Sequence, residues 1–300
     1  MIAIDWGSSS LRAYRLDAAG GILEQRRSDQ GVLLCNGEFT AVLLKLIEGW
    51  EDPVILLAGM IGSRSGWREM PYLDCPVGVQ ELATALEPMQ ISELPGRTLW
   101  FVPGVADQSS ASVPDVVRGE ETQVCGLLDA LQQGSHVVCL PGTHSKWIVV
   151  RDGRLQSINT AMTGEIYAVL RQHSMLGKLM GGDDSRFDAY AFDMGLQRSA
   201  EMGGLLHHLF GVRTAGLFGQ FSEAALPSYL SGLLIGHEVR ASELFSRTPR
   251  PAQVHLVGSD RLLTAYARTL LALGIGVQRH PEHLAASGMH ALWQLRSRAQ

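Results

Sequence analysis

The sequence has little of what marks a disulfide-stapled, membrane-spanning or nucleic-acid-binding protein. Its 300 residues include only 4 cysteines, none in a Cys-x-x-Cys pair, which argues against a disulfide scaffold and a finger-type zinc site. No uncharged apolar run reaches the ~18 residues that a membrane helix needs. With 25 Lys and Arg against 30 Asp and Glu, the formal net charge is −5, so the chain has no overall positive field for nucleic acid or an acidic membrane.

The first residues also lack a targeting signal. Met1 runs directly into apolar residues and Asp5, without the basic region that opens a signal peptide. We therefore expect a soluble, cytoplasmic protein. Its partner should be a small molecule rather than nucleic acid or a membrane.

The composition is that of a folded globular protein rich in glycine. Apolar residues make up 46% of the chain and charged residues 18%, which is enough apolar material for a large core. Glycine occupies 33 of the 300 positions, against a typical share of about 7%. This excess indicates many tight turns and places where the backbone approaches another group closely.

A strand-turn-strand pattern occurs twice, about half a chain apart. Alternating apolar residues surround the turn Gly7–Ser10 in residues 2–17, and the turn Gly142–Ser145 in residues 137–153. The two turns are 142 − 7 = 135 residues apart, and the same offset aligns the next turn of each segment. Any two β-hairpins look somewhat alike, but the agreement of both turns under one offset indicates an internal repeat.

Strands and helices alternate between and after these two segments. Short apolar runs predict strands, and apolar positions at helical spacing predict helices, a combination typical of mixed sheets covered by helices. We expect two lobes, 1–133 and 134–300, with the last helix packing back on the N-terminal lobe. The expected strands are 53–57, 99–102, 254–257 and 275–278, and the expected helices are 39–48, 122–131, 166–180, 202–210, 222–245 and 261–273.

Both turns have the composition of a phosphate-binding loop. Glycine lets backbone N–H groups approach an anion, and neighbouring hydroxyls add donors. Asp5 precedes the first turn, and its carboxylate would repel phosphate unless a metal intervened, which suggests Mg²⁺ held through water. An ordinary turn explains either motif alone, but the pair at matched positions favours phosphate binding. The expected phosphate-binding residues are Gly7, Ser8, Ser9 and Ser10 in the first turn and Gly142, Thr143, His144, Ser145 and Lys146 in the second.

Several motifs resemble a known superfamily. Residues Asp5–Arg12 resemble the first phosphate motif of the sugar kinase, Hsp70 and actin superfamily, and Leu140–Trp147 resemble its second. Val254–Ser259 is similar to the adenosine motif, which makes Gly258 and Ser259 candidate ATP-binding residues. More narrowly, the segments 58–64, 118–123 and 162–165 resemble the 2-dehydro-3-deoxygalactonokinase family.

The resemblance implies a fold and an activity. The fold would be α/β, with two duplicated ribonuclease-H-like lobes of the actin-like ATPase type and an ATP cleft between them. The activity would be ATP- and Mg²⁺-dependent phosphorylation of the terminal 6-hydroxyl of 2-dehydro-3-deoxy-D-galactonate, in D-galactonate catabolism. A kinase of another sugar or sugar acid, such as 2-dehydro-3-deoxygluconate, and a non-catalytic sugar sensor are alternatives. A homodimer is compatible with this family.

The catalytic base is expected shortly before the second turn, as in sugar kinases of this superfamily. Glu121 precedes an amphipathic helix and lies 143 − 121 = 22 residues before Thr143, so it is the first candidate, with Glu120 the second. Both acids are alternatively explained as first-turn residues that complement the helix dipole.

The sugar acid needs a cation for its carboxylate and an apolar cover for its ring. Arg64 follows a buried strand, and an arginine there is suited to bidentate carboxylate binding. Trp67 or Trp6 would cover the apolar face of the sugar, and Glu165, in a family-like block, is a further candidate substrate residue. Arg64 is equally explained as a solvated loop charge. The turn 181–185 is a weaker candidate for contacts with sugar hydroxyls.

Overall fold

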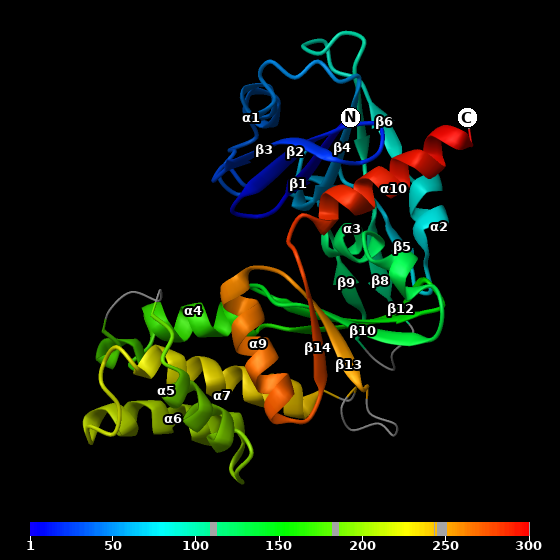
Figure 1. Cartoon of the computed structure of the whole chain (residues 1–300). Coiled ribbons are helices and arrows are strands. Elements are labelled where there is room, and N and C mark those ends of the chain that lie inside the picture. Colours follow the sequence, from blue (N-terminus) through cyan, green and yellow to red (C-terminus); the bar gives the residue numbers. More distant parts are fainter. Residues whose placement is uncertain (109–112, 182–185, 243, 245–250, 300) are drawn as a thin grey trace. The chain divides into compact units, whose positions relative to one another are not determined.

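The computed structural model describes residues 1–108, 113–181, 186–242, 244 and 251–299 (Figure 1). These residues form two compact units. Unit 1 comprises Met1–His136, Ile148–Asn159 and Pro281–Gln300, and unit 2 comprises Val137–Trp147 and Thr160–His280. The expected division at residues 133 and 134 stays a prediction.

A six-stranded sheet forms the centre of unit 1. Strand β1 pairs antiparallel with β2 and parallel with β4, so that Asp5 lies opposite Arg12 and Trp6 opposite Gly59. The side chains of β1 and β4 are nearly all buried, because both faces of the sheet are covered. The strand order is β3 (Ile22–Ser28), β2 (Leu11–Leu16), β1 (Ile2–Trp6), β4 (Val54–Gly59), β7 (Thr98–Phe101) and β6 (Glu87–Met89).

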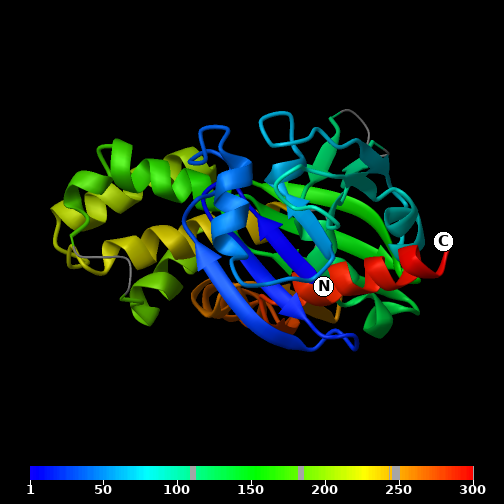
Figure 2. The ribbon, with the colours of Figure 1, turned by 90° about the horizontal axis from the view of Figure 1, so that it is seen from above.

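The other elements of unit 1 are short, apart from its last helix. A three-stranded sheet has the order β5 (Tyr72–Asp74), β8 (Gly104–Asp107) and β9 (Asp115–Val117). The C-terminal helix α10 (Leu284–Arg298) packs against α3, α2 and β1, and Figure 2 shows it running alongside the first sheet. The remaining helices are α1 (Phe39–Leu46), η1 (Met60–Gly62), α2 (Val79–Thr84), α3 (Glu120–Cys125) and η2 (Leu128–Leu131).

A five-stranded sheet repeats the strand order of the first. Its parallel strands β10, β13 and β14 pair in the same way as β1, β4 and β7. The order β12-β11-β10-β13-β14 therefore corresponds to β3-β2-β1-β4-β7, which confirms the internal repeat expected from the sequence. The strands are β12 (Arg154–Ala161), β11 (Ser145–Arg151), β10 (Ser135–Leu140), β13 (Gln253–Val257) and β14 (Gly276–His280).

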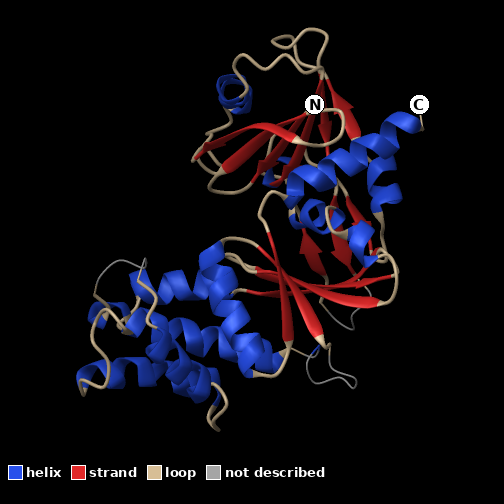
Figure 3. Cartoon of the chain, viewed as in Figure 1, coloured by secondary structure: helices blue, strands red, loops and turns tan. Residues whose placement is uncertain are grey.

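Helices make up most of unit 2 (Figure 3). The central one is α7, whose side chains are mostly buried and which packs against α4, α5, α6 and α9. A helix buried on nearly all sides is expected to be mainly apolar, and most of α7 is, although His237, Glu238 and Arg240 lie near its end. The helices are α4 (Thr163–His173), η3 (Gly177–Leu179), α5 (Ala189–Arg198), α6 (Gly204–Leu217), α7 (Leu226–Ala241) and α9 (Asp260–Ala272).

Most elements expected from the sequence are present, with shifted ends. The helix expected at 166–180 ends at His173, and the one expected at 222–245 corresponds to α7, which begins at Leu226 and ends at Ala241. The sequence patterns did not predict α2, α5, β6 or the three-stranded sheet. All four cysteines are described and free, as expected. Among the described residues, no helix is long and apolar enough to cross a membrane.

Candidate functional site

The first turn of unit 1 is held by hydrogen bonds from a neighbouring segment. The Gly7 N–H donates to Ser10 O at 2.9 Å and closes the turn. Val32 N donates to Gly7 O and Leu33 N to Ser8 O, each at 3.0 Å, so the carbonyls of the turn face that segment. Ser8 and Ser10 are half-buried and Ser9 is exposed. The turn is therefore fixed in place with its serines at the surface of the unit.

Asp5, at the end of β1, lies among other carboxylates. Burial raises the pKa of Asp5 to about 6, Arg12 opposes the shift, and the charges of Glu120 and Glu282 add to it. Arg12 Nη1 lies 3.6 Å from Asp5 Oδ2. Gly119, just before α3, has φ +112°, and a Cβ there would lie 3.8 Å from Asp5 Oδ1 and 3.1 Å from Gly59 Cα. The absence of a side chain at Gly119 thus brings the start of α3 close to Asp5.

The two acids at the start of α3 have different surroundings. Glu121 is fully buried, and its Oε2 accepts the Gly119 N–H at 2.6 Å, while its Oε1 has no hydrogen-bond partner among the described residues. Burial, assisted by the charge of Glu120, raises the pKa of Glu121 to about 8. Glu120 is only half-buried, and its Oε2 accepts the Arg118 N–H at 3.0 Å. At neutral pH Glu121 is therefore mostly protonated, whereas Glu120 keeps access to an external group.

Arg118 is a buried cation beside these acids that sequence reasoning did not single out as a site residue. Its guanidinium carbon lies 4.1 Å from the centre of the Tyr72 ring, and Nη2 donates to Met70 O at 2.8 Å. Its Nη1 is buried and has no hydrogen-bond partner among the described residues. The only sequence signal was its position as the first residue of the family-like segment 118–123.

The structure does not bring the expected substrate-binding residues of unit 1 together. Trp6 is fully buried and donates to Gln30 O at 3.0 Å, so its ring is a core residue and is not available to a sugar. The side chain of Arg64 is 91% exposed and pairs with Glu69, which matches the solvated-charge alternative. Trp67 is partly buried against the apolar core, and its ring stacks on Phe39 at 6.1 Å.

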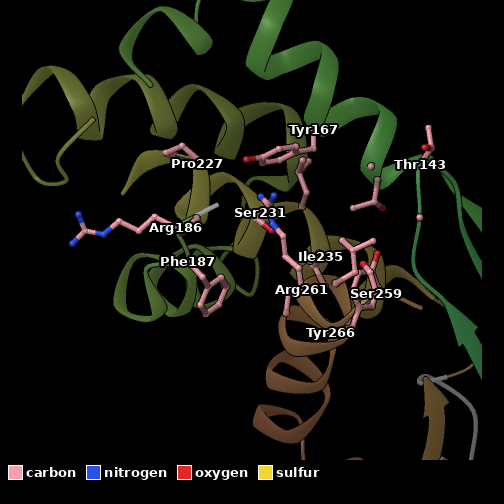
Figure 4. A pocket seen from close by; sticks show the side chains of 17 residues that line it. Thr143, Tyr167, Arg186, Phe187, Pro227, Ser231, Ile235, Ser259, Arg261 and Tyr266 are labelled. Carbon is pink, nitrogen blue, oxygen red and sulfur yellow. The ribbon is translucent and has the colours of Figure 1, made fainter. Parts of the chain in front are cut away.

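A pocket of about 390 Å³ lies in unit 2 beside the second turn (Figure 4). Gly142 and Thr143 line it together with Ser259, so three of the expected ATP-binding residues meet around one cavity. Gly258, with φ +154°, brings the loop after β13 next to the same turn, because a Cβ there would lie 3.6 Å from Pro141 O. The turn after β10 and the loop after β13 thus form one wall of the pocket.

The start of α4 forms the adjoining wall. Thr163 and Gly164 line the pocket, and a Cβ on Gly164 would lie 2.3 Å from Gly142 O, so only glycine allows this close approach. The Glu165 N–H donates to Thr143 O at 2.8 Å, and the Glu165 carboxylate lies 2.5 Å from His144 Nε2. Glu165, expected at the substrate, is therefore engaged with the second turn. Helix α4 begins without a side-chain cap, which leaves N–H donors near the pocket.

Two residues of the second turn have side chains directed into the unit. Ser145 is fully buried, and its hydroxyl bonds to Tyr266 Oη at 2.6 Å. Lys146 is largely buried, and its Nζ donates to Thr160 Oγ1 at 3.0 Å. Contrary to expectation, neither side chain is exposed at the turn for a phosphate. The exposed members of the turn are Thr143 and His144.

The pocket also contains residues that sequence reasoning missed. In Figure 4 Arg261 reaches from α9 toward Ser231, whereas the side chain of Arg186 extends away from them. Tyr167 and Tyr266 add aromatic surface. Arg261 lies two residues after the adenosine motif, which is the one signal that pointed to it. Of the turn 181–185, residues 182–185 lie outside the described part of the chain.

The repeated sheets and paired turns define a protein of the actin-like ATPase fold, and solved structures agree. An activator of 2-hydroxyisocaproyl-CoA dehydratase from Clostridium difficile, with bound ADPNP, matches 100% of this chain and 96% of its own, with a TM-score of 0.50 and 15% identity. This similarity confirms the expected fold class.

The family follows from closer relatives. The model of the 2-keto-3-deoxy-galactonokinase family matches residues 5–292. The 2-dehydro-3-deoxygalactonokinase of Escherichia coli (strain K12) is 34% identical over 279 residues, which cover 92% of this chain and 91% of that protein. A crystal structure of a 2-dehydro-3-deoxygalactonokinase protein from Sinorhizobium meliloti has a TM-score of 0.85 and 32% identity, covering 99% of this chain and 98% of that one. The chain belongs to the 2-keto-3-deoxygalactonokinase family of sugar-acid kinases, which confirms the predicted membership.

Proposed function

We propose that the protein transfers the γ-phosphate of ATP to the terminal 6-hydroxyl of 2-dehydro-3-deoxy-D-galactonate, giving the 6-phosphate and ADP in D-galactonate catabolism. The names of its relatives state this substrate. The observation that carries the proposal is the pocket of unit 2, where a glycine turn and an uncapped helix start meet in a chain of this family.

Unit 2 would bind the nucleotide. Backbone N–H groups at Gly142 and Thr143 and at the start of α4 suit the phosphates, because a helix N-terminus favours anions. Arg261 adds a positive charge, and Ser259 lines the pocket from the loop after β13. The apolar and aromatic lining of the pocket would accommodate the adenine ring of the nucleotide.

Unit 1 would activate the sugar hydroxyl. Glu121 was the first candidate from sequence, but its burial and raised pKa favour Glu120 as the proton acceptor, with Glu121 behind it. Phosphoryl transfer depends mainly on positioning and charge, so the proton acceptor needs to be well placed rather than strongly basic. We propose that Glu120 accepts the proton of the 6-hydroxyl while Glu121 stays neutral.

Magnesium would be held through water at Asp5, whose pKa is raised by burial and by the neighbouring charges of Glu120 and Glu282. Carboxylate oxygens are ligands that Mg²⁺ prefers, with waters completing its shell. Among the described residues no group of three acidic, Cys or His side chains could hold a metal, which fits binding through water. When bound, Mg²⁺ offsets the negative charge of the transferring phosphate.

The substrate is tested by ADP release across a panel of acceptors. We expect release to depend on 2-dehydro-3-deoxy-D-galactonate, with the gluconate epimer and neutral hexoses as comparisons. Preference for a neutral hexose or for the epimer would replace the proposed substrate by the corresponding alternative. Nucleotide binding without any acceptor-dependent release would favour a sensor.

We also propose that the protein is cytoplasmic and forms a homodimer. Large apolar side chains are exposed around α6, namely Met202 at 97%, Leu206 at 86% and Phe218 at 81%, together with Phe210. A second copy of the chain would cover this surface, and light scattering of the wild type and of Phe210→Glu tests it. A monomeric mass for the wild type would remove the proposal.

A further inference from the structure

A chain of hydrogen bonds lies beneath the second turn and uses a carboxylate that has no role in the proposed chemistry. Ser145, the first residue of β11, bonds to Tyr266 Oη at 2.6 Å. The Tyr266 hydroxyl donates to Glu238 Oε2, also at 2.6 Å. Because the proton of Tyr266 goes to Glu238, Ser145 must be the donor to Tyr266. The chain therefore runs from the turn to Glu238.

Glu238 accepts two further hydrogen bonds. Trp147 Nε1 donates to Oε1 at 2.7 Å, and the Thr163 side chain is hydrogen-bonded to the same carboxylate. These residues come from four elements, since Trp147 is on β11, Glu238 on α7, Tyr266 on α9 and Thr163 at the start of α4. Thr163 and Tyr266 also line the pocket. One carboxylate on α7 thus joins the turn to α4 and α9, which also line the pocket.

An ionised carboxylate satisfies every donor in this arrangement. Tyr266, Trp147 and Thr163 all act as donors, and a carboxylate offers two oxygens with about four acceptor positions. Burial raises the pKa of Glu238, and the three hydrogen bonds oppose that shift by stabilising the charged form. Glutamine has the same shape but a single acceptor oxygen, and its NH₂ group would face another donor. A fully satisfied buried network of this kind is rigid.

We infer that Glu238 is a positioning residue, which fixes the second turn against α4 and α9 so that its backbone N–H groups are set for the nucleotide phosphates before binding. The inference rests on the proposed function only for the identity of the ligand. Glu238 does not itself line the pocket, so its effect on the ligand would pass through Ser145, Tyr266 and Thr163. The backbone bond from Glu165 to Thr143 holds the turn from the other side.

The test compares Glu238→Gln, Tyr266→Phe and Ser145→Ala with the wild-type full chain. Ser199→Ala is the matched control, because it removes another buried hydroxyl of unit 2, bonded to Leu196 O and Arg240, away from the pocket lining. Hydrogen exchange of the segment 142–147 is measured without ligand, and the affinity for the ATP analogue ADPNP is measured by calorimetry.

We expect faster exchange in 142–147 and an affinity for ADPNP at least tenfold lower in Glu238→Gln, with a smaller change of the same sign in Tyr266→Phe and Ser145→Ala. The KM for ATP should rise while the KM for the sugar acid stays within twofold. The double variant of Glu238 and Tyr266 should be little worse than Glu238→Gln, because both act through one network. Ser199→Ala should change neither exchange in 142–147 nor affinity.

These measurements distinguish failure of the Glu238 inference from failure of the proposed kinase function. Unchanged exchange and affinity within twofold of wild type in Tyr266→Phe and Ser145→Ala would overturn the inference, even if Glu238→Gln failed to fold. An equal effect of Ser199→Ala would also overturn it, since general destabilisation would then explain the data. A wild type that binds no ADPNP would instead contradict the proposed function, and the exchange data would still decide whether the network orders the turn.

Discussion

The turns Gly7–Ser10 and Gly142–Ser145 follow matching strands of the two sheets, β1 and β10. In unit 1, helix α3 begins after Gly119, close to Asp5, and in unit 2 helix α4 begins at Thr163, with Gly164 close to Gly142 O. Their surroundings differ in how far polar groups are satisfied. Near the first turn, Glu121 Oε1 and Arg118 Nη1 have no partner among the described residues, and the pKa of Asp5 is raised. Beneath the second turn, the carboxylate of Glu238 has donors on both oxygens.

This difference indicates which of the two units carries the proton transfer and which binds the nucleotide. A buried carboxyl group that has a raised pKa and an oxygen without a hydrogen-bond partner among the described residues, as at Glu121, is typical of sites that move protons or hold ions. A satisfied hydrogen-bond network instead fixes geometry, which suits the binding of a phosphate chain by backbone N–H groups. Unit 1 therefore has the features of the chemical half, and unit 2 has those of the binding half.

The largest effect is expected at Glu120. Glu120→Gln removes the proposed proton acceptor, and loss of a general base lowers turnover by about 10²-fold or more. Glu121→Gln should cost much less, because a pKa raised to about 8 keeps Glu121 mostly protonated at pH 7. Turnover of the two variants is measured at saturating substrates. If Glu121→Gln lowers turnover more than Glu120→Gln does, Glu121 is the proton acceptor, as the sequence suggested, and the choice of Glu120 from burial is wrong.

Gly164→Ala should damage the binding half. The added Cβ would lie 2.3 Å from Gly142 O, so either the turn or α4 must move. Overpacking of this kind costs about 2 kcal/mol, or about 30-fold in affinity if the whole cost falls on binding. The affinity for ADPNP is measured by calorimetry. Gly211→Ala is the control, because its Cβ would meet nothing closer than 4.0 Å in α6, and it should bind as the wild type does.

Because Glu121 is buried, we expect the free energy of unfolding to fall as the pH rises. Its pKa is raised from 4.5 to about 8 in the folded state, so its contribution is complete below pH 4.5 and is lost as the pH rises through about 8. Between pH 6 and pH 7, the free energy of unfolding of the wild type should fall by about 1.4 kcal/mol relative to Glu121→Gln. Urea unfolding at both pH values measures this. A parallel pH dependence of the two proteins would show that Glu121 is ionised in the folded chain.

The smallest effect is expected at Arg64. Its exposed guanidinium pairs only with Glu69 among the described residues, and such surface pairs contribute about 0–1 kcal/mol. Arg64→Ala should leave the KM for the sugar acid within twofold of wild type, as steady-state kinetics can check. A KM raised tenfold or more would restore Arg64 as the cation that binds the substrate carboxylate.

The repeat and the long elements could be predicted because their signals are local. Strands β1 and β10 are apolar runs ending in glycine turns, and α9 has apolar residues at helical spacing. The three-stranded sheet was missed because its strands have only 3 or 4 residues, too short for a period to appear. Its stability comes from pairing between segments far apart in the sequence.

The site was only partly predictable, for a related reason. Gly142, Thr143 and Ser259 could be found because turn composition and the adenosine-like motif are local. The burial of Trp6 follows from its place on the same face of β1 as Ile2 and Ile4, a signal that was present but not used. The difference between Glu120 and Glu121, and the role of Glu238, depend on which helices pack against them. One sequence does not contain that information.

Calorimetric titration of ADPNP into Glu120→Gln tests the division between the two units most directly. If unit 1 serves the chemistry and unit 2 the nucleotide, this variant should bind ADPNP within twofold of wild type while its turnover is about 10²-fold lower. A loss of affinity that matches the loss of turnover would contradict the account, because Glu120 would then serve nucleotide binding itself.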